Sequence, residues 1–168
     1  MPALFIILHE LHHSVFRKPD QLSPLVKEHL ECTKNHFKQL CVQFGEGECH
    51  SGIRTVYEDA PDVEALRTAY DIFSNIYSQQ KKNVYFKKYR VTRDQAFFYS
   101  VGMNWCTEEE YATHSKTDPH SPLLIRLNGM VSLMPEFTRA FKCREGDRMY
   151  SDDQTTCHIF GNNNQLEK

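Results

Sequence analysis

Residues 4–13 form an apolar run that passes directly into a polar one, Leu4-Phe5-Ile6-Ile7-Leu8-His9-Glu10-Leu11-His12-His13. Apolar positions recur at helical spacing, which predicts one buried helix over residues 3–16. His9 and His13 are four positions apart, so both imidazoles leave the same face of that helix and can share a metal ion. Glu10 follows the first histidine, where its carboxylate can take a proton from a metal-bound water. His12 is out of phase with the pair and is not a candidate ligand. The alternative is a helix that carries polar residues on one face without binding a metal.

A metal site with two histidines needs a third protein ligand, and a second acidic segment offers one. Residues 57–62 read Tyr57-Glu58-Asp59-Ala60-Pro61-Asp62. Glu58 is the candidate third ligand, and Asp62 is placed to accept a hydrogen bond from the second ring nitrogen of a ligand histidine and so orient it. The alternative is that two acids in the first turn of a helix only complement the helix dipole.

The rest of the chain also shows mainly helical periodicity, with few and short alternating patterns. Residues 23–44 are predicted to form a helix, with Ser23 as N-cap, Pro24 at the first helical position and Gly45 beyond the end. The two prolines of residues 118–122 predict a rigid loop. The basic stretch 79–90 predicts a solvated connection. The predicted helices cover residues 3–16, 23–44, 60–79 and 93–114, a short run after residue 122, and 134–141. The fold class is therefore mostly α, with a single domain over 1–160 and a disordered tail over 161–168.

Composition agrees with one globular domain of ordinary charge. The chain has 168 residues, with 20 basic and 22 acidic side chains and a formal net charge of −2. Forty per cent of the residues are hydrophobic, which argues against disorder of the whole chain. A near-neutral charge gives no footprint for nucleic acid or acidic lipid. No segment approaches the about 20 apolar residues of a membrane span.

Six cysteines and nine histidines are the unusual counts. No two cysteines form a Cys-x-x-Cys pair, which disfavours a zinc ribbon or a redox dithiol. An even number at wide spacing favours disulfides in an oxidising compartment, and buried thiols in a cytosolic protein are the alternative. The apolar start lacks a basic region and a cleavage site, so it is not a signal peptide. We therefore expect that the N-terminus is missing. The cysteines are Cys32, Cys41, Cys49, Cys106, Cys143 and Cys157.

Several motifs together resemble the C-terminal catalytic part of the neprilysin and endothelin-converting-enzyme family of zinc metallopeptidases. The similarity runs from about Leu4 to Phe160 and is densest between Phe97 and Cys143. The string from Asp118 to Pro122, with the arginine that follows it, is specific to this family. The motifs, in order, are His9-Glu10-x-x-His13, Glu58-x-x-x-Asp62, Thr117-Asp118-Pro119-His120-Ser121-Pro122, Arg126, Asn128-Gly129, Met134-Pro135-Glu136-Phe137, Ala140-Phe141-x-Cys143 and Cys157-x-x-Phe160.

The resemblance implies a thermolysin-like catalytic region built of packed helices with few or no strands. It implies one zinc ion per chain, held by His9, His13 and Glu58. Glu10 would be the general base and then the proton shuttle to the leaving amine.

The resemblance also implies three further roles. His120 would donate to the oxyanion of the tetrahedral intermediate, held in place by Asp118, and Arg126 would bind the substrate carbonyl beyond the scissile bond. Family members cleave peptides outside the cell, so peptide substrates and an extracellular or plasma-membrane ectodomain location are implied.

Two departures from the family pattern concern the residues around the site. The family reads Glu-Asn-x-x-Asp at the third ligand, whereas this chain has Asp59 and Pro61 within that motif. Pro61 predicts a helix that starts only at Ala60, with Asp59 as N-cap and Glu58 outside the helix. The residues after His13 are Ser14-Val15-Phe16-Arg17, so an acid of the outer shell is lost there.

The resemblance also predicts disulfides and a missing upstream part. Cys41 and Cys157 match a pair internal to this region, and Cys32 and Cys49 are additional and could bridge each other. Cys106 and Cys143 match cysteines whose partners lie in N-terminal segments that this chain lacks. The family's substrate-binding strand and helical lid domain are also lacking.

Two hypotheses follow from these matches and departures. The first is a zinc-dependent metalloendopeptidase, truncated or catalytically impaired. The alternative is a non-enzymatic extracellular interaction domain that retains the peptidase fold.

Overall fold

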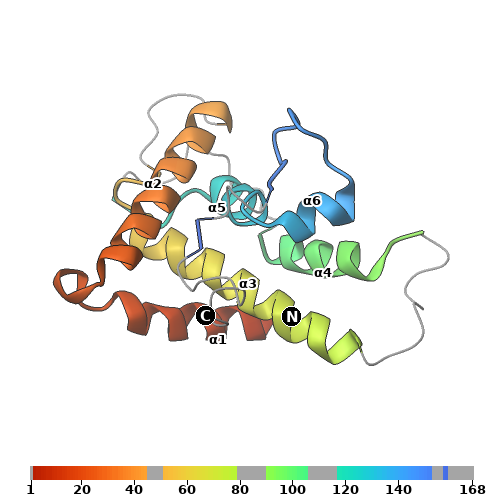
Figure 1. Ribbon diagram of the computed structural model, residues 1–168, viewed down its shortest axis with the longest axis horizontal. Helices are drawn as coiled ribbons and strands as arrows, with labels where there is room; N and C mark the ends of the chain where they lie inside the picture. The colour runs from red at the N-terminus through yellow and green to blue at the C-terminus, as the bar shows by residue number, and fades with distance from the viewer. Residues whose placement is uncertain (1, 45–50, 79–89, 106–116, 153–156, 159–168) are drawn as a thin grey trace, which may run out of the picture.

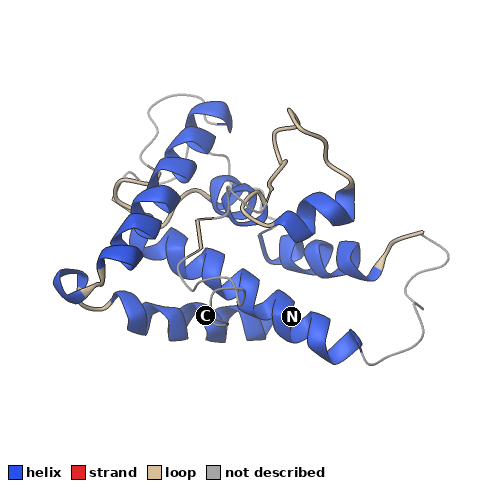
Figure 2. Cartoon of the chain, viewed as in Figure 1, coloured by secondary structure: helices blue, strands red, loops and turns tan. Residues whose placement is uncertain are grey.

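The computed structural model describes residues 2–44, 51–78, 90–105, 117–152 and 157–158. Within these ranges the chain is helical and contains no strand, which confirms the predicted mostly-α class (Figures 1 and 2). The predicted connection 79–90, except Arg90, and the tail from Gly161 lie outside the described residues. The elements are α1 (Pro2–Phe16), η1 (Pro19–Gln21), α2 (Pro24–Phe44), α3 (Val56–Ser78), α4 (Arg93–Gly102), η2 (Met103–Trp105), α5 (Leu123–Val131) and α6 (Pro135–Phe141).

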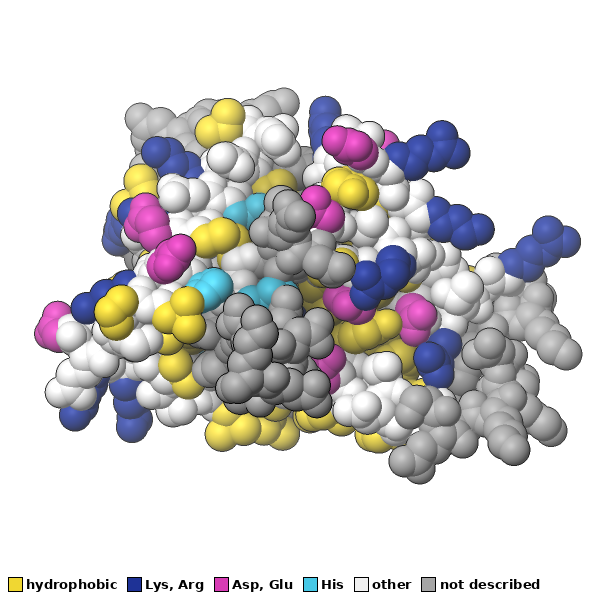
Figure 3. Space-filling model, in the orientation of Figure 1, with side chains coloured by type: hydrophobic (Ala, Val, Ile, Leu, Met, Phe, Trp, Pro, Cys, Tyr) yellow, Lys and Arg dark blue, Asp and Glu magenta, His cyan; other side chains and the backbone are white. Residues whose placement is uncertain are grey.

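Helix α1 packs along α3 (Figure 1). Its two faces differ in the burial of their side chains. Its inner face buries Phe5, Leu8 and Phe16. Its outer face leaves Ile6, Ile7 and Leu11 between 57% and 60% exposed, and apolar side chains line the lower edge of the molecule in Figure 3. The helix was therefore predicted correctly, but the prediction that it is buried holds only for its inner face.

Helix α2 starts as the sequence predicts and packs on α3 and α5. The Ser23 hydroxyl accepts a hydrogen bond from the Val26 N–H at 3.3 Å, as an N-cap does. Phe37 is fully buried against Gly129 of α5, where any side chain would overlap its ring. This close approach brings α5, and with it Arg126, next to the central helix α3.

Helix α3 begins at Val56, four residues before the predicted start at Ala60. The Thr55 carbonyl accepts hydrogen bonds from the N–H groups of Glu58 and Asp59, both at 2.8 Å, and this closes the first turn. Pro61 lies inside the helix. It lacks only the N–H that would reach back to Tyr57, which is an exposed residue. The prediction of Asp59 as N-cap and of Glu58 outside the helix was therefore wrong.

Helices α4 and α6 pack together over an aromatic cluster. Thr92 caps α4 in a capping box with Gln95. The predicted helix over 93–114 is α-helical only to Gly102 and then tightens into η2, and residues 106–116 lie outside the described part. The predicted short run and the 134–141 helix are confirmed as α5 and α6. The cluster joins α3, α4 and α6 through Tyr70, Phe73, Phe97, Phe98, Phe137 and Phe141.

A disulfide joins Cys32 of α2 to Cys157, with their Cα atoms 5.5 Å apart. The predicted pairs Cys41–Cys157 and Cys32–Cys49 were therefore wrong. Cys32 and Cys41 are about 13 Å apart along the axis of α2, so only one of them can reach Cys157. Cys41 is disulfide-bonded as well. Cys143 is a free, half-buried thiol, and Cys106 lies outside the described residues.

A search of the described helices for a membrane-spanning segment found none that is long and apolar enough.

Candidate metal centre

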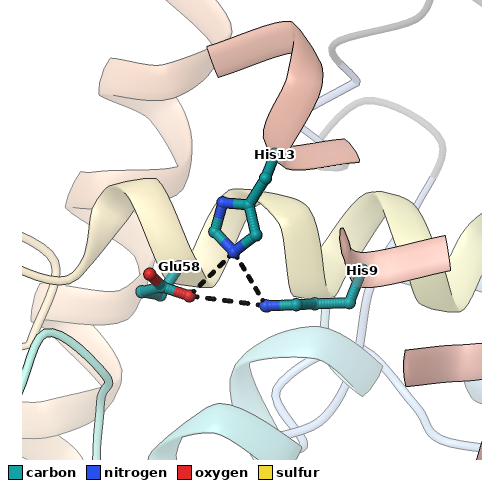
Figure 4. Close-up of side chains that lie close together, drawn as sticks. All are labelled: His9, His13 and Glu58. Carbon is teal, nitrogen blue, oxygen red and sulfur yellow. Dashed lines mark hydrogen bonds and ion pairs between the residues drawn. The ribbon is translucent and has the colours of Figure 1, made fainter. Parts of the chain in front are cut away.

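Three side chains from α1 and α3 converge on one point, as Figure 4 shows. His9 Nε2 lies 3.0 Å from His13 Nε2. Glu58 Oε2 lies 3.4 Å from the His9 nitrogen and 3.1 Å from the His13 nitrogen. The two histidines project from successive turns of α1, and Glu58 projects from the first turn of α3 because that helix begins early. The earlier start of α3 thus places Glu58 inside the helix, facing the two histidines, whereas the sequence predicted it outside the helix.

The triangle of His9, His13 and Glu58 has the dimensions of a tetrahedral zinc site. Zinc binds histidine nitrogen and carboxylate oxygen at about 2.0–2.1 Å, so neighbouring ligand atoms of a tetrahedron lie about 3.3 Å apart. The three observed separations, 3.0, 3.1 and 3.4 Å, fall around that value. Two imidazole nitrogens and one carboxylate oxygen also form the ligand set of catalytic zinc sites. The residues therefore fit a zinc ion, with one position left for water.

Asp62 lies behind His9 and is fully buried. Its Oδ1 lies 2.7 Å from His9 Nδ1, the nitrogen that faces away from the triangle. Burial lowers the pKa of His9, but the hydrogen bond and the charge of Asp62 outweigh burial and leave that pKa raised. A carboxylate in this position fixes the ring orientation of a ligand histidine. Asp62 thus lies against the His9 nitrogen that faces away from the triangle, and its role behind a metal ligand stays a prediction.

Arg126 of α5 pairs with the same carboxylate from the other side. Its Nε and one Nη atom lie 2.6 and 2.8 Å from the two oxygens of Asp62. The guanidinium carbon lies 4.5 Å from the centre of the Trp105 ring, and that ring packs edge-on against Phe5 of α1. The sequence carries no signal for this contact, because a tryptophan on a helical face indicates only a core residue.

His120 reaches the triangle from the loop before α5. Its Nε2 lies 3.3 Å from Glu58 Oε2, and its Nδ1 lies 2.9 Å from Asp118 Oδ1. The same Asp118 oxygen accepts a hydrogen bond from the backbone N–H of His120 at 2.9 Å. Asp118 therefore sets both the backbone turn and the ring orientation of His120.

Glu10 and His12 do not join the triangle. Glu10 is exposed, and among the described residues its carboxylate makes no hydrogen bond or ion pair. His12 Nδ1 lies 2.7 Å from the carbonyl of Leu8, so its ring is turned toward its own helix. The position of His12 agrees with its exclusion as a ligand. The role of Glu10 stays a prediction.

A buried polar cluster beneath the site was missed by the sequence analysis. Asp59 Oδ2 accepts hydrogen bonds from the hydroxyls of Thr55 and Ser121, at 2.5 and 3.0 Å. Burial raises the pKa of Asp59 to about 8, although both hydrogen bonds oppose that rise. Asp59 and Ser121 directly follow Glu58 and His120 in the chain, and this adjacency was the available signal.

Comparison with known proteins gives consistent matches over this region. Neprilysin of Homo sapiens is 28% identical over 137 residues, which cover 80% of this chain and 18% of neprilysin. Endothelin-converting enzyme 1 of Bos taurus is 29% identical over 158 residues, which cover 86% of this chain and 21% of that enzyme. Neprilysin-3 of Drosophila melanogaster is 32% identical over 107 residues, which cover 61% of this chain and 14% of that protein.

The chain thus spans between 14% and 21% of the length of these relatives. A comparison with solved structures gave no significant match. The sequence pattern of Peptidase family M13 matches residues 5–157, which include every residue of the triangle and its neighbours. The chain therefore belongs to peptidase family M13.

Proposed function

We propose that this chain is the zinc-binding catalytic region of a metalloendopeptidase that cleaves peptides outside the cell. The observation that carries the proposal is the triangle of His9, His13 and Glu58, whose separations of 3.0–3.4 Å match those between the ligands of one tetrahedral zinc ion. Membership of peptidase family M13 supports peptide hydrolysis as the reaction.

His9, His13 and Glu58 would hold one zinc ion, and Asp62 would keep the His9 ring aimed at it. A zinc ion in such a site lowers the pKa of a bound water to about 7 and polarises a carbonyl. Asp62 is well placed for this task because it is buried and accepts from His9 on one oxygen while Arg126 neutralises its charge.

Glu10 would act as the general base and then return the proton to the leaving amine. It follows the first ligand on α1, and its exposure leaves the carboxylate free to meet a substrate. Proton transfer by a positioned carboxylate of this kind contributes about 10²–10⁴-fold to the rate of hydrolysis.

His120 and Arg126 would bind the two carbonyl groups of the substrate. Asp118 lies 2.9 Å from His120 Nδ1 and would orient the ring so that its other nitrogen, Nε2, faces a developing oxyanion. Removal of one such donor lowers kcat about 10²–10³-fold. Arg126 uses two of its five N–H groups on Asp62, which leaves donors for the carbonyl beyond the scissile bond.

Zinc stoichiometry by native mass spectrometry tests the proposal. We expect one zinc ion per chain, lost in His13→Ala and in Glu58→Ala but retained in His12→Ala, the matched control on the same helix. Equal zinc in wild type and Glu58→Ala contradicts the ligand set. Absence of zinc from wild type supplied with the metal contradicts the proposal as a whole.

A second assay separates the enzyme from the alternative of a non-enzymatic extracellular domain. Glu10→Gln keeps the size of the side chain and removes the base. We expect it to bind zinc as wild type does and to lose hydrolysis of a quenched fluorescent peptide. A wild-type chain that binds zinc and hydrolyses no peptide supports the alternative, a non-enzymatic extracellular interaction domain that retains the peptidase fold.

A further inference from the structure

The cluster of Thr55, Asp59 and Ser121 lies within the fold, directly beneath the candidate site. All three residues are at most 2% exposed. The Thr55 hydroxyl accepts from the Gly52 N–H at 2.8 Å and donates to Asp59 Oδ2 at 2.5 Å. The Ser121 hydroxyl lies 3.0 Å from the same Asp59 oxygen and 2.9 Å from the Thr55 hydroxyl. Two hydroxyl groups from distant parts of the chain therefore converge on one carboxyl oxygen.

This cluster is joined to the site by two pairs of chain neighbours. Glu58 and Asp59 are consecutive on α3, and His120 and Ser121 are consecutive in the loop before α5. The outer members, Glu58 and His120, approach to 3.3 Å at the site. The inner members, Asp59 and Ser121, are hydrogen-bonded at 3.0 Å in the interior. The contact of Asp59 with Ser121 lies one residue along each segment from the contact of Glu58 with His120. The inner contact therefore restricts where the side chains of Glu58 and His120 can lie.

We propose that Asp59 is a positioning residue that, through its hydrogen bond to Ser121, holds the His120 segment against α3 so that His120 faces Glu58. The segment also contacts this region through the Ser121 and Thr55 hydroxyls, 2.9 Å apart, and through the contact of His120 with Glu58. The side chains of His120 and Asp118 are 39% and 38% exposed, whereas Ser121 and Asp59 are at most 1% exposed, so the hydroxyl–carboxyl contact lies on the buried side of the segment. The buried bond of Ser121 to Asp59 therefore ties the segment to α3 from the inner side.

A merely structural role for Ser121 predicts a different pattern of change. Ser121 precedes Pro122, the N-cap of α5, and a defect at the helix start would loosen α5 as well. Arg126 is fixed independently by its two contacts with Asp62. Under the proposal, loss of the link loosens Asp118, His120 and Ser121 but leaves the backbone of Arg126 as it was.

Backbone order parameters from ¹⁵N relaxation of the full chain test the proposal without metal or substrate. In wild type we expect values near about 0.85 at His120 and Ser121, and in Ser121→Ala values below about 0.6 there, with Arg126 unchanged. Ser132→Ala is the matched control, because Ser132 is also buried and hydrogen-bonded but lies at the far end of α5. If Ser121→Ala does not fold, Ser121→Cys keeps the size and leaves only a weak donor.

The Asp59 variants give the second arm. Asp59→Asn keeps an oxygen that can accept from both hydroxyls, so it should keep the order parameters of His120 near those of wild type. Asp59→Ala removes the acceptor and should lower them as Ser121→Ala does. Native values in Ser121→Ala, equal loosening in Asp59→Asn and Asp59→Ala, or equal loosening of Arg126 would each overturn the proposal.

The catalytic consequence rests on the proposed function and has its own readout. In zinc-loaded protein, Ser121→Ala should lower kcat for peptide hydrolysis about tenfold, leave KM within about twofold and leave zinc stoichiometry unchanged. A chain without zinc or activity contradicts the proposed function and leaves the order-parameter test in force. Loosening of His120 with unchanged kcat overturns the assignment of Asp59 as a positioning residue for the reaction.

Discussion

Asp62 connects a candidate ligand, His9, with the predicted substrate-binding arginine, Arg126. It contacts His9 Nδ1 with one oxygen and Arg126 with both. Asp62→Asn weakens both contacts, so we expect zinc affinity to fall about 10–100-fold, as is typical when a carboxylate behind a ligand histidine is removed. Competition with a chelator measures this change. Asp71→Asn, on the exposed side of the same helix, is the control and should bind zinc as wild type does.

A second residue-scale prediction concerns His36, which is paired with Ser132 at 2.9 Å. Burial lowers the pKa of His36 from 6.5 to about 4. His36 therefore binds a proton more readily in the unfolded chain than in the folded one. The folded state has its full stability above pH 6.5 and loses stability as the pH falls toward about 4. Between pH 7 and pH 5 the free energy of unfolding should fall by about 2 kcal/mol from this group. Urea unfolding at both pH values should show a smaller fall in His36→Gln, and an equal fall contradicts the assignment.

At the scale of elements, the contact between α2 and α5 depends on one missing side chain. A Cβ at Gly129 would overlap the ring of Phe37, whereas a Cβ at Gly102 would meet its nearest neighbour at 3.9 Å. Gly129→Ala should therefore lower the free energy of unfolding by about 1–3 kcal/mol through overpacking. Gly102→Ala, in the last turn of α4, should leave that free energy equal or slightly higher. Chemical denaturation of the two variants compares them directly, and equal stabilities would contradict this account of the contact.

Helix existence was predictable from local signals, and helix boundaries were predictable only where a cap is local. Ser23 and Pro24 fixed the start of α2 because capping involves residues within one turn. The predicted start of α3 was wrong because Asp59 is not an N-cap but lies in the first turn, where it contacts both Thr55 nearby and a distant residue. Asp59 bonds to Ser121, which lies 62 residues away, and no local pattern reports that contact.

At the scale of the whole molecule, the Cys32–Cys157 disulfide closes a loop with a sequence separation of 125 residues. Such a link restricts the unfolded chain, so Cys32→Ser should lower the free energy of unfolding by about 2–5 kcal/mol. Cys143→Ser removes a free thiol and should change it by less than about 0.5 kcal/mol. Urea denaturation without reductant measures both. Equal stability of wild type and Cys32→Ser would contradict a stabilising role for the disulfide.

The residues of the candidate site were largely predictable from the sequence, but the contacts that join them to the rest of the fold were not. Spacing brought His9 and His13 to one face of a helix, and the resemblance supplied Glu58, His120 and Arg126, which the structure brings together. The predicted disulfide pairs were wrong because the pairing depends on which part of α2 meets the C-terminal segment. The contact of Arg126 with Trp105 was missed for the same reason, since it joins two elements through the fold.

The burial of Phe5, Leu8 and Phe16 has a consequence for the roll of α1 about its own axis. Imidazole nitrogens lie about 6 Å from that axis, so a roll of about 30° would move them by about 3 Å. That displacement equals the 3.0 Å that separates the two imidazole nitrogens. The three buried side chains oppose rotation of α1 about its axis. Any such rotation would expose them to water on one side and cause overlap with α3 on the other. The orientation of the two histidines in the proposed ligand set is therefore maintained by hydrocarbon side chains that are not themselves ligands.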